Sequence, residues 1–255
     1  MMKVLVTGSE GMIGSRLTKY LKETYDQGPD QITEFDGEIS IWEDWSKYIE
    51  TKYDFVIHLA GLAGVRTSFE DPDGYFRTNV EGTHNAIQFS TMMSSKLLYA
   101  SSSNAYEWWG NPYAATKKMN EVQAKGKNAI GMRFHTVWPG RDDMLFRKLE
   151  RNEVTYINAG HTRDFIHVWD LIKAIQILMD RFNVVIKTNP VVDIGTGTSV
   201  SVLDVAKIYD FDGEIRTENP TGERENTQAD VDWLLKFGWE PEYNILNREH
   251  HVDYV

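Results

Sequence analysis

The chain has 255 residues, of which 41% are hydrophobic and 25% are charged, a composition typical of a globular protein rather than of a disordered or fibrous one. Its 27 Lys and Arg residues against 38 Asp and Glu residues give a formal net charge of −11. This charge argues against a general nucleic-acid binder, which needs clustered cations, and the lack of cysteine excludes disulfides, thiolate nucleophiles and cysteine-bound zinc.

No stretch of the sequence is long and apolar enough to cross a membrane. The longest mainly apolar run, residues 55–65, falls well short of the ~20 residues that a membrane-spanning helix needs. A predicted strand, Lys3–Thr7, lies so close to the first residue that we expect no signal peptide. We therefore expect a cytoplasmic protein with neither a membrane nor a nucleic acid as its partner.

Short apolar runs alternate with segments of helical periodicity through the first half of the chain. This alternation is typical of a parallel sheet with crossover helices, so the predicted fold class is α/β, with a Rossmann-type doubly wound parallel sheet. The predicted strands are Lys3–Thr7, Ile32–Asp36, Phe55–Ala60, Lys96–Ser101 and Ala129–Phe134. The predicted helices are Met12–Tyr25, ended by Gly28-Pro29, and Thr78–Met93.

The pattern changes after Trp138, where residues 139–143 predict a turn-rich break and later elements become shorter and more polar. A helix at Val168–Arg181 and a strand at Val191–Ile194 are apolar enough to return to the first sheet. We therefore predict an NAD-binding domain of residues 1–138 and 166–196, and a small C-terminal substrate-binding lobe of residues 139–165 and 197–255. The tail from Asn247, with its two histidines, is predicted to be a frayed end.

Three glycines, Gly8, Gly11 and Gly14, follow the first predicted strand and lead into the first helix. Small residues here let the backbone approach a pyrophosphate, and the helix N-terminus offers N–H groups to the anion; the alternative is a tight structural turn. Asp36, at the end of the next strand, can bind the ribose hydroxyls of adenosine and repel a 2′-phosphate, which favours NAD over NADP. Alternatively, Asp36 only opens the turn with Gly37.

Tyr113 and Lys117 lie four residues apart and so share one face of a predicted helix. A tyrosine acts as a base near pH 7 only if its proton, ordinarily lost near pH 10, is released more easily, and a nearby ammonium group helps by stabilising the phenolate. The run Ser101-Ser102-Ser103 places hydroxyl groups at the carboxyl end of a strand. Sheets of this kind bind their ligands at that edge.

Together these residues resemble the extended short-chain dehydrogenase/reductase family, in its NAD-dependent epimerase/dehydratase branch. The resemblance covers nearly the whole chain and is carried by the glycine turn and by residues 55–61, 79–83, 99–103, 111–118, 163–168 and 237–241. Within the family, residues 63–66, 113–118 and 133–144 are most similar to UDP-glucuronate 4-epimerases.

The resemblance implies a role for each matching residue. Ser102 is the catalytic hydroxyl, with Ser103 as its alternative. Tyr113 takes the proton from the 4-hydroxyl of the sugar while hydride passes to NAD, and Lys117 holds the cofactor ribose and stabilises the phenolate. The 4-keto sugar then turns over and receives the hydride on its other face. The implied function is an NAD-dependent nucleotide-sugar 4-epimerase, with UDP-glucuronate and UDP-galacturonate as the expected pair.

The same resemblance assigns binding residues. Those for the cofactor are Gly8, Gly11, Met12, Ile13, Gly14, Asp36, Glu38, Ile39, Leu59, Ala60, Gly61, Asn79, Tyr113 and Lys117, and those for the substrate are Ser102, Ser103, Thr136, Arg141 and Arg163. Arg163 matches an arginine on the nucleotide diphosphate, with a surface arginine as the alternative, and Arg141 matches a uronate-reading arginine, with a structural turn residue as the alternative. The histidines show no metal-ligand spacing, so no metal is expected.

Dehydratases of this family carry an Asp-Glu pair directly after the catalytic threonine. This chain has Ser103-Asn104 there, which favours an epimerase over a dehydratase. The alternatives are another nucleotide-sugar oxidoreductase, such as a UDP-glucose 4-epimerase, a reductase or a dehydratase, and a non-catalytic NAD-binding sensor. The family commonly pairs the helices that follow Asn79 and Tyr113 into a dimer, so we expect a homodimer.

Two segments depart from the family pattern. Glu38 and Ile39 follow the second strand almost directly, where an acidic and an aliphatic residue usually meet the adenine. The connection of residues 103–112 is shorter than the family usually has, and it contains Trp108 and Trp109. These tryptophans either fill the space left by the shortened loop or form a platform for a sugar or a base.

Overall fold

The computed structural model describes residues 2–24, 31–142 and 144–251. The chain divides into two compact units, Met1–Arg133 with Leu178–Val192 and Phe134–Ile177 with Asp193–Val255. The first break therefore follows Arg133, a few residues earlier than the sequence suggests. The assignment of one part to the cofactor and the other to the substrate stays a prediction.

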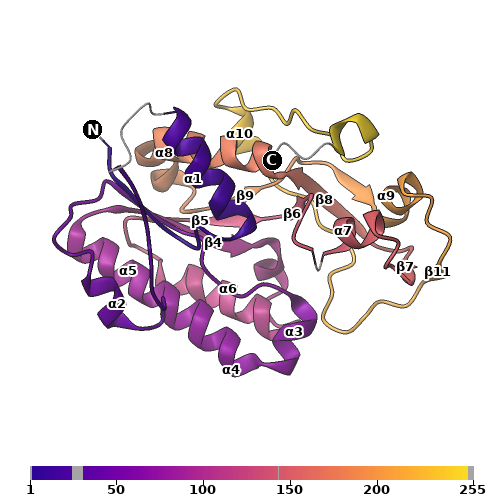
Figure 1. Cartoon of the computed structure of the whole chain (residues 1–255), viewed down its shortest axis with the longest axis horizontal. Helices are drawn as coiled ribbons and strands as arrows, with labels where there is room; N and C mark the ends of the chain where they lie inside the picture. The colour runs from indigo at the N-terminus through magenta and orange to yellow at the C-terminus, as the bar shows by residue number, and fades with distance from the viewer. Residues whose placement is uncertain (1, 25–30, 143, 252–255) are drawn as a thin grey trace. The chain divides into compact units, whose positions relative to one another are not determined.

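A six-stranded sheet organises the first unit (Figure 1). Its order is β2-β1-β3-β4-β5-β9, and the pairs β1/β2, β1/β3 and β3/β4 are parallel. Every residue of β1 and β3 is buried, as expected for strands that are covered on both faces. The predicted α/β fold with a Rossmann-type parallel sheet is therefore confirmed. The strands are β1 (Val4–Thr7), β2 (Ile32–Glu34), β3 (Phe55–His58), β4 (Lys96–Ser102), β5 (Ala129–Phe134) and β9 (Val191–Ile194).

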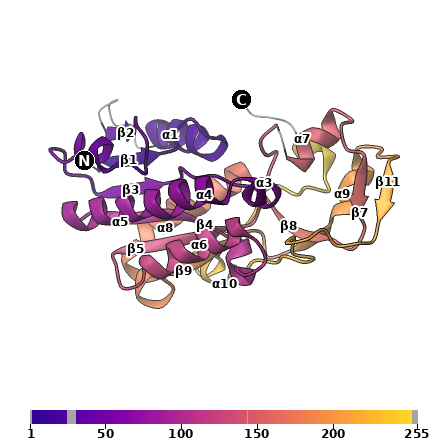
Figure 2. The same cartoon turned by 90° about the horizontal axis from the view of Figure 1, so that it is seen from below.

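Helices cover both faces of this sheet, with α5 and α6 on one face and α1 on the other (Figure 1, Figure 2). The predicted helix Thr78–Met93 is a π-helical segment followed by α5, and the part of the first predicted helix at Tyr25, with Gly28-Pro29, lies outside the described residues. The helices are α1 (Met12–Thr24), α2 (Trp42–Ser46), α3 (Val65–Glu70), α4 (Pro72–Tyr75), the π-helix η2 (Phe76–Glu81), α5 (Gly82–Met93), the 3-10 helix η3 (Ser103–Glu107), α6 (Pro112–Gln123) and α8 (Val168–Thr188).

The second unit contains the shorter elements that the sequence predicts after Trp138. Two small sheets have the orders β10-β8-β6 and β11-β7, and Trp138, Phe146 and Ile157 belong to one buried apolar cluster. The elements are β6 (Thr136–Trp138), α7 (Leu145–Glu150), β7 (Tyr156–Asn158), β8 (Thr162–His167), β10 (Ser199–Ser201), α9 (Val202–Ile208), β11 (Glu214–Arg216), α10 (Asp232–Leu235) and the 3-10 helix η4 (Arg248–His251).

The prediction of a frayed tail from Asn247 is wrong for the described part of that segment. The His251 ring stacks on Tyr209 with centroids 5.5 Å apart, and its Nδ1 atom shares a 2.8 Å hydrogen bond with the Tyr209 hydroxyl. Its Nε2 atom lies 2.6 Å from the carbonyl oxygen of Ile245. The two ring nitrogens and the flat imidazole therefore fasten η4 to the second unit.

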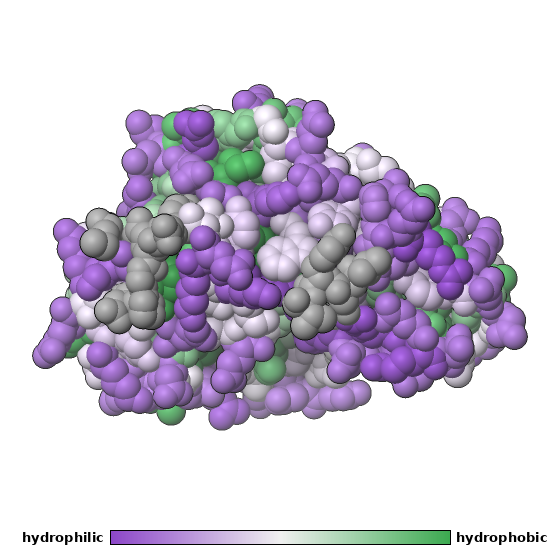
Figure 3. Space-filling model, turned by 45° about the horizontal axis from the view of Figure 1, so that its top comes forward, coloured by the Kyte–Doolittle hydropathy of each residue, from purple (hydrophilic) through white to green (hydrophobic). Residues whose placement is uncertain are grey.

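Hydrophilic residues cover most of the face seen in Figure 3, and hydrophobic residues are scattered among them. Among the described residues, no helix is both long enough and apolar enough to span a membrane.

Candidate active site

The glycine turn joins β1 to α1, as predicted. Gly8 has a φ of +70°, and a Cβ atom there would lie 2.7 Å from the backbone nitrogen of Ala60. A Cβ atom on Gly14 would lie 2.0 Å from the carbonyl oxygen of Gly8. Contacts within the turn and with the end of β3 therefore already require these two glycines. Contact of the turn with a pyrophosphate stays a prediction.

A cavity of about 430 Å³ lies beside this turn. It brings together six of the predicted cofactor residues, namely Gly8, Asp36, Glu38, Ile39, Ala60 and Gly61. The other lining residues are not among those predicted from the sequence, and they are Ser9, Glu10, Glu34, Phe35, Gly37, Leu62 and Thr78. Most of these are direct chain neighbours of predicted residues. Gly11, Met12, Ile13, Gly14, Leu59 and Asn79 are not among the residues that line this cavity.

Helix α2 and the residues after it hold the Asp36 side of the cavity. The hydroxyl of Tyr48 accepts a 2.7 Å hydrogen bond from the backbone nitrogen of Asp36, and the carboxylate of Asp44 accepts one of 2.8 Å from the nitrogen of Glu38. The indole of Trp45 donates to the carbonyl oxygen of Ile39 at 2.8 Å. These contacts fix the short segment after β2, and they leave the Asp36 side chain exposed.

The opposite wall is held by buried polar side chains. The hydroxyl of Thr7 accepts from the nitrogen of Ala60 at 3.2 Å and lies 2.8 Å from Nδ1 of His58. The Asn79 amide binds the backbone of Leu62 twice, accepting from its nitrogen at 2.8 Å and donating to its oxygen at 3.0 Å. Asn79 is 1% exposed. In this structure it therefore positions the wall, and its predicted contact with the cofactor stays a prediction.

Burial, and then the nearby charge of Lys117, lower the pKa of His58 to about 3. The imidazole is consequently neutral at physiological pH. Its Nε2 atom has no hydrogen-bond partner among the described residues. A neutral ring is the form that can lie beside the lysine ammonium without charge repulsion.

Helix α6 carries Tyr113 and Lys117. It begins at Pro112, and the side chain of Asn111 caps it by accepting from the nitrogen of Ala114 at 2.7 Å. The ammonium of Lys117 lies 5.9 Å from the centroid of the Tyr113 ring, so the predicted pairing of these two residues on one helix face is observed. The Tyr113 ring also packs edge-on against Tyr75, with centroids 6.1 Å apart.

Lys117 connects this helix to the end of β4 and to the cavity. Its ammonium donates to the carbonyl oxygen of Ala100 at 3.1 Å, and burial lowers the pKa of Lys117 to about 8. A Cβ atom on Gly61, which lines the cavity, would lie 3.3 Å from this ammonium and 2.9 Å from the Oδ1 atom of Asn79. The bare backbone of Gly61 therefore separates the cavity from the buried lysine.

Ser102 ends β4, two residues beyond the carbonyl that binds Lys117. It is 5% exposed, and its Oγ atom accepts from the backbone nitrogen of Asn104 at 3.2 Å. Since this bond uses only a lone pair, the serine hydroxyl keeps its proton to donate. Ser103 begins η3 and is 6% exposed.

The predicted substrate residues Thr136, Arg141 and Arg163 belong to the second unit. Thr136 begins β6 and is half-buried, and Arg141 is exposed in the turn after β6. The guanidinium of Arg163 donates to the carbonyl oxygens of Thr162 and Glu225, at 2.9 and 2.8 Å. It is therefore anchored in the fold, unlike a simple surface arginine.

Arg224, which is not among the residues predicted from the sequence, is near enough to Arg163 for its charge to act on it. Burial lowers the pKa of Arg163, the charge of Glu223 opposes this, and the positive charge of Arg224 lowers it further. Because Arg163 and Arg224 lie far apart in the sequence, no local pattern reveals the pair.

The tryptophans of the short connection are exposed. Trp108 is 48% and Trp109 is 70% exposed, and their rings meet edge to face with centroids 6.0 Å apart. Side chains that fill a gap would be buried, so the filling interpretation is wrong for Trp109 in particular. The platform interpretation stays a prediction.

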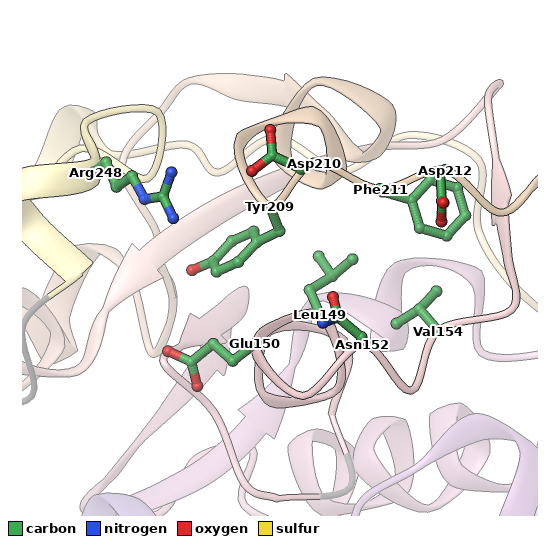
Figure 4. Close-up of a pocket in the computed structure, with 9 residues that line it drawn as sticks. All are labelled: Leu149, Glu150, Asn152, Val154, Tyr209, Asp210, Phe211, Asp212 and Arg248. Atoms are coloured by element: carbon green, nitrogen blue, oxygen red, sulfur yellow. The ribbon is translucent and has the colours of Figure 1, made fainter.

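A larger cavity, of about 580 Å³, lies within the second unit and contains none of the predicted site residues (Figure 4). Leu149, Val154 and Phe211 form its apolar part, and Glu150 and Arg248 add opposite charges. Within the part of the chain that the structure describes, no group of three or more histidine, aspartate or glutamate residues is placed to hold a metal ion. The residues that the sequence predicts for catalysis, Ser102, Tyr113 and Lys117, belong to the first unit.

Comparisons with known proteins identify the family of this chain. The model of a family described as "NAD dependent epimerase/dehydratase family" matches residues 4–195. An uncharacterized protein of Methanocaldococcus jannaschii is 31% identical over 230 residues, covering 68% of this chain and 70% of that protein. UDP-glucuronate 4-epimerase 4 of Arabidopsis thaliana is 28% identical over 69% of this chain, but the match covers only 54% of the plant protein.

Two solved structures are similar to nearly the whole chain. MoeE5 in complex with UDP-glucose and NAD is 26% identical and has a TM-score of 0.79, with 98% of this chain and 96% of that chain covered. MoeE5 in complex with UDP-glucuronic acid and NAD is 27% identical and has a TM-score of 0.77, with 96% and 95% covered. The chain thus belongs to the NAD dependent epimerase/dehydratase family and is an NAD-dependent enzyme of the extended short-chain dehydrogenase/reductase type.

Proposed function

We propose that the protein is a nucleotide-sugar 4-epimerase that interconverts UDP-glucuronate and UDP-galacturonate. The observation that carries the catalytic part of this proposal is the buried Lys117, which lies beside Tyr113, binds the end of β4 next to Ser102, and adjoins the cavity at Gly61. The uronate part of the proposal rests on Arg141 and on the similarity to proteins named for, or solved with, UDP-glucuronic acid.

The cavity fits the dinucleotide that the family uses. Asp36 offers a carboxylate suited to ribose hydroxyls, and the N-terminus of α1 lies next to the glycine turn that lines the cavity, where a pyrophosphate would be stabilised. The bare backbone of Gly61 leaves room for a ligand to approach Lys117. When bound, NAD supplies the acceptor and donor of hydride for the sugar carbon.

The protein's own residues then handle the proton. The Lys117 ammonium, still mostly protonated at pH 7, stabilises Tyr113 as a phenolate, and this phenolate oxygen takes the proton of the sugar hydroxyl and becomes a neutral phenol. The hydroxyl of Ser102 donates to the same sugar oxygen. Neither Ser103 nor Asn104 carries a carboxyl group, which supports epimerisation over the removal of water.

The proposal is tested by incubating the NAD-loaded protein with UDP-, dTDP- and GDP-sugars and identifying the products by NMR. We expect UDP-glucuronate and UDP-galacturonate to interconvert toward one equilibrium ratio from either side. If only UDP-glucose and UDP-galactose interconvert, the substrate of the proposed epimerase is a neutral hexose and not a uronate. A dehydrated keto sugar as the product would contradict the epimerase function.

Arg141→Ala tests the choice of a uronate. A guanidinium that binds a carboxylate through two charge-assisted hydrogen bonds contributes roughly 1.5–3 kcal/mol, so this variant should lower kcat/KM for UDP-glucuronate by about 10–150-fold. A neutral hexose gains nothing from this contact, so the rate with UDP-glucose should stay the same. An equal loss on both substrates would make Arg141 a structural or phosphate-binding residue.

We also propose a homodimer through helices α5 and α6. Met92 on α5 and Met119 and Val122 on α6 are 52%, 46% and 57% exposed. Large apolar side chains exposed on neighbouring helices are typical of a surface that is buried on association. These exposures support the pairing that the family resemblance implies.

A further inference from the structure

A buried ion pair lies just behind the catalytic residues. The carboxylate of Glu121, on α6, accepts two hydrogen bonds of 2.7 Å from the guanidinium of Arg133, on β5. The two side chains are only 5% and 15% exposed. Burial would raise the pKa of Glu121, but the Arg133 guanidinium holds it below its ordinary value, so the pair is ionised at physiological pH.

Glu121 also fastens the catalytic helix to β4. One of its carboxylate oxygens accepts a 2.8 Å hydrogen bond from the hydroxyl of Ser101, the residue directly before Ser102. One helical turn earlier, Lys117 binds the carbonyl oxygen of Ala100. Two consecutive turns of α6 are therefore tied to two consecutive residues of β4, immediately before the serine.

Arg133 contacts the segment that follows Ser102 in the chain. The centre of its guanidinium lies 4.2 Å from the centroid of the Tyr106 ring, a stacking distance for a cation on an aromatic face. Tyr106 belongs to η3, which Ser102 caps at its N-terminus. The ion pair thus contacts the residue before Ser102, the helix after it, and the helix that carries Tyr113.

Stability alone is a weak reason for such a pair. Desolvating two charges offsets most of their attraction, and a well-packed apolar pair in their place is often as stable. Position is a stronger reason, because Ser102 and Tyr113 lie on different elements, β4 and α6, and along the chain only residues 103–112 connect them. Direct contacts between α6 and β4 therefore help to hold Ser102 and Tyr113 at a fixed separation.

We propose that Glu121 and Arg133 are positioning residues that set the separation of Ser102 and Tyr113 across the short connection. The inference rests on the proposed function, in which these two groups act on one sugar oxygen. Neither Glu121 nor Arg133 lines the cofactor cavity. The pair should therefore affect the rate of reaction and leave cofactor binding unchanged.

Glu121→Gln and Arg133→Lys are the first variants. The glutamine keeps the shape but loses the charge, and the lysine keeps the charge but loses both the paired hydrogen bonds and the flat face on Tyr106. A displacement of about 1 Å between reacting groups costs up to about a hundredfold in rate. We expect kcat for UDP-glucuronate to fall about 30–100-fold in Glu121→Gln and about tenfold in Arg133→Lys, with the Kd for NAD changed less than about threefold.

The double variant Glu121→Leu/Arg133→Met separates positioning from stability. The single glutamine variant leaves the Arg133 charge buried and unpaired, so its Tm should drop by about 10 °C, and removing both charges should restore most of that loss. Under our proposal kcat stays low in the double variant although Tm recovers. Recovery of kcat together with Tm would overturn the proposal, as would a kcat in the two single variants within about threefold of the unmodified protein.

Lys118→Met is the matched control. Lys118 also binds the Glu121 carboxylate, at 3.2 Å through the oxygen that Ser101 does not use, but Lys118 is more exposed than Arg133. Its loss should therefore change kcat by less than about threefold. A loss as large as that of Glu121→Gln would assign the effect to general electrostatics and overturn the proposal.

Tyr113→Phe distinguishes a failure of this inference from a failure of the proposed function. An active Tyr113→Phe contradicts the proposed function itself. An inactive Tyr113→Phe together with fully active Glu121 and Arg133 variants contradicts only this inference.

Discussion

Tyr113→Phe is expected to lower kcat of the proposed epimerisation by about 10²–10⁴-fold, the range that a well-placed acid or base contributes. The substitution removes only the phenolic oxygen, so the ring keeps its edge-on contact with Tyr75. Binding of NAD should change little, because Tyr113 does not line the cavity beside the glycine turn. NMR measures product formation, and isothermal titration measures NAD binding.

Tyr75→Phe provides the matched control for this experiment. Its hydroxyl shares a 2.6 Å hydrogen bond with Thr67, away from the proposed chemistry, so the variant should keep kcat within a few fold of the unmodified protein. If Tyr113→Phe turned over at nearly the normal rate, the base would lie elsewhere. Tyr106 and a relay through a serine and water would then be the candidates to examine.

Lys117→Met is expected to have the second largest effect, lowering kcat by about 10²–10³-fold and weakening NAD binding as well. Methionine approximates the length of the side chain but removes the charge that stabilises the Tyr113 phenolate. The lysine is only 5% exposed, so removal of its buried charge should offset the loss of its hydrogen bond to Ala100, and the Tm should change little. Lys118→Met, one position later and partly exposed, is again the control.

The pH profile tests the same residue without a mutation. Burial lowers the pKa of Lys117 to about 8, so the ammonium is present below that pH and is lost above it. We therefore expect kcat of the unmodified protein to decline as pH rises through about 8. Lys117→Met should not show this decline, and its persistence in the variant would assign the titration to another group.

Local patterns in the sequence predict the main features of the fold and site. The alternation of apolar runs and helical segments identifies each strand of the central sheet to within two residues at each end, because strands buried on both faces leave a continuous apolar run. The four-residue spacing of Tyr113 and Lys117 also fixes their shared helix face. Helix α2 was not predicted, since a five-residue helix has too few turns to show a period.

The contacts that hold the site were not predicted, because they join residues far apart in the chain. The pairing of Glu121 with Arg133 and of Asn79 with Leu62 depends on which strands and helices become neighbours, and neither pair has a distinctive spacing. The same reason applies to the anchoring of Asp36 by Tyr48. Exposure of Trp109 was also not predicted, since a bulky aromatic residue ordinarily indicates burial.

The absent side chain of Gly61 has a consequence for how this enzyme could change over time or by design. One methyl group there would press on the Lys117 ammonium and the Asn79 amide, at a residue that also lines the cavity. A substitution of Gly61 is therefore expected to alter cofactor binding and the proposed catalytic Lys117 together. Substitutions that alter only cofactor binding are expected near Asp36, and substitutions that alter only the proposed catalytic residues are expected near Glu121.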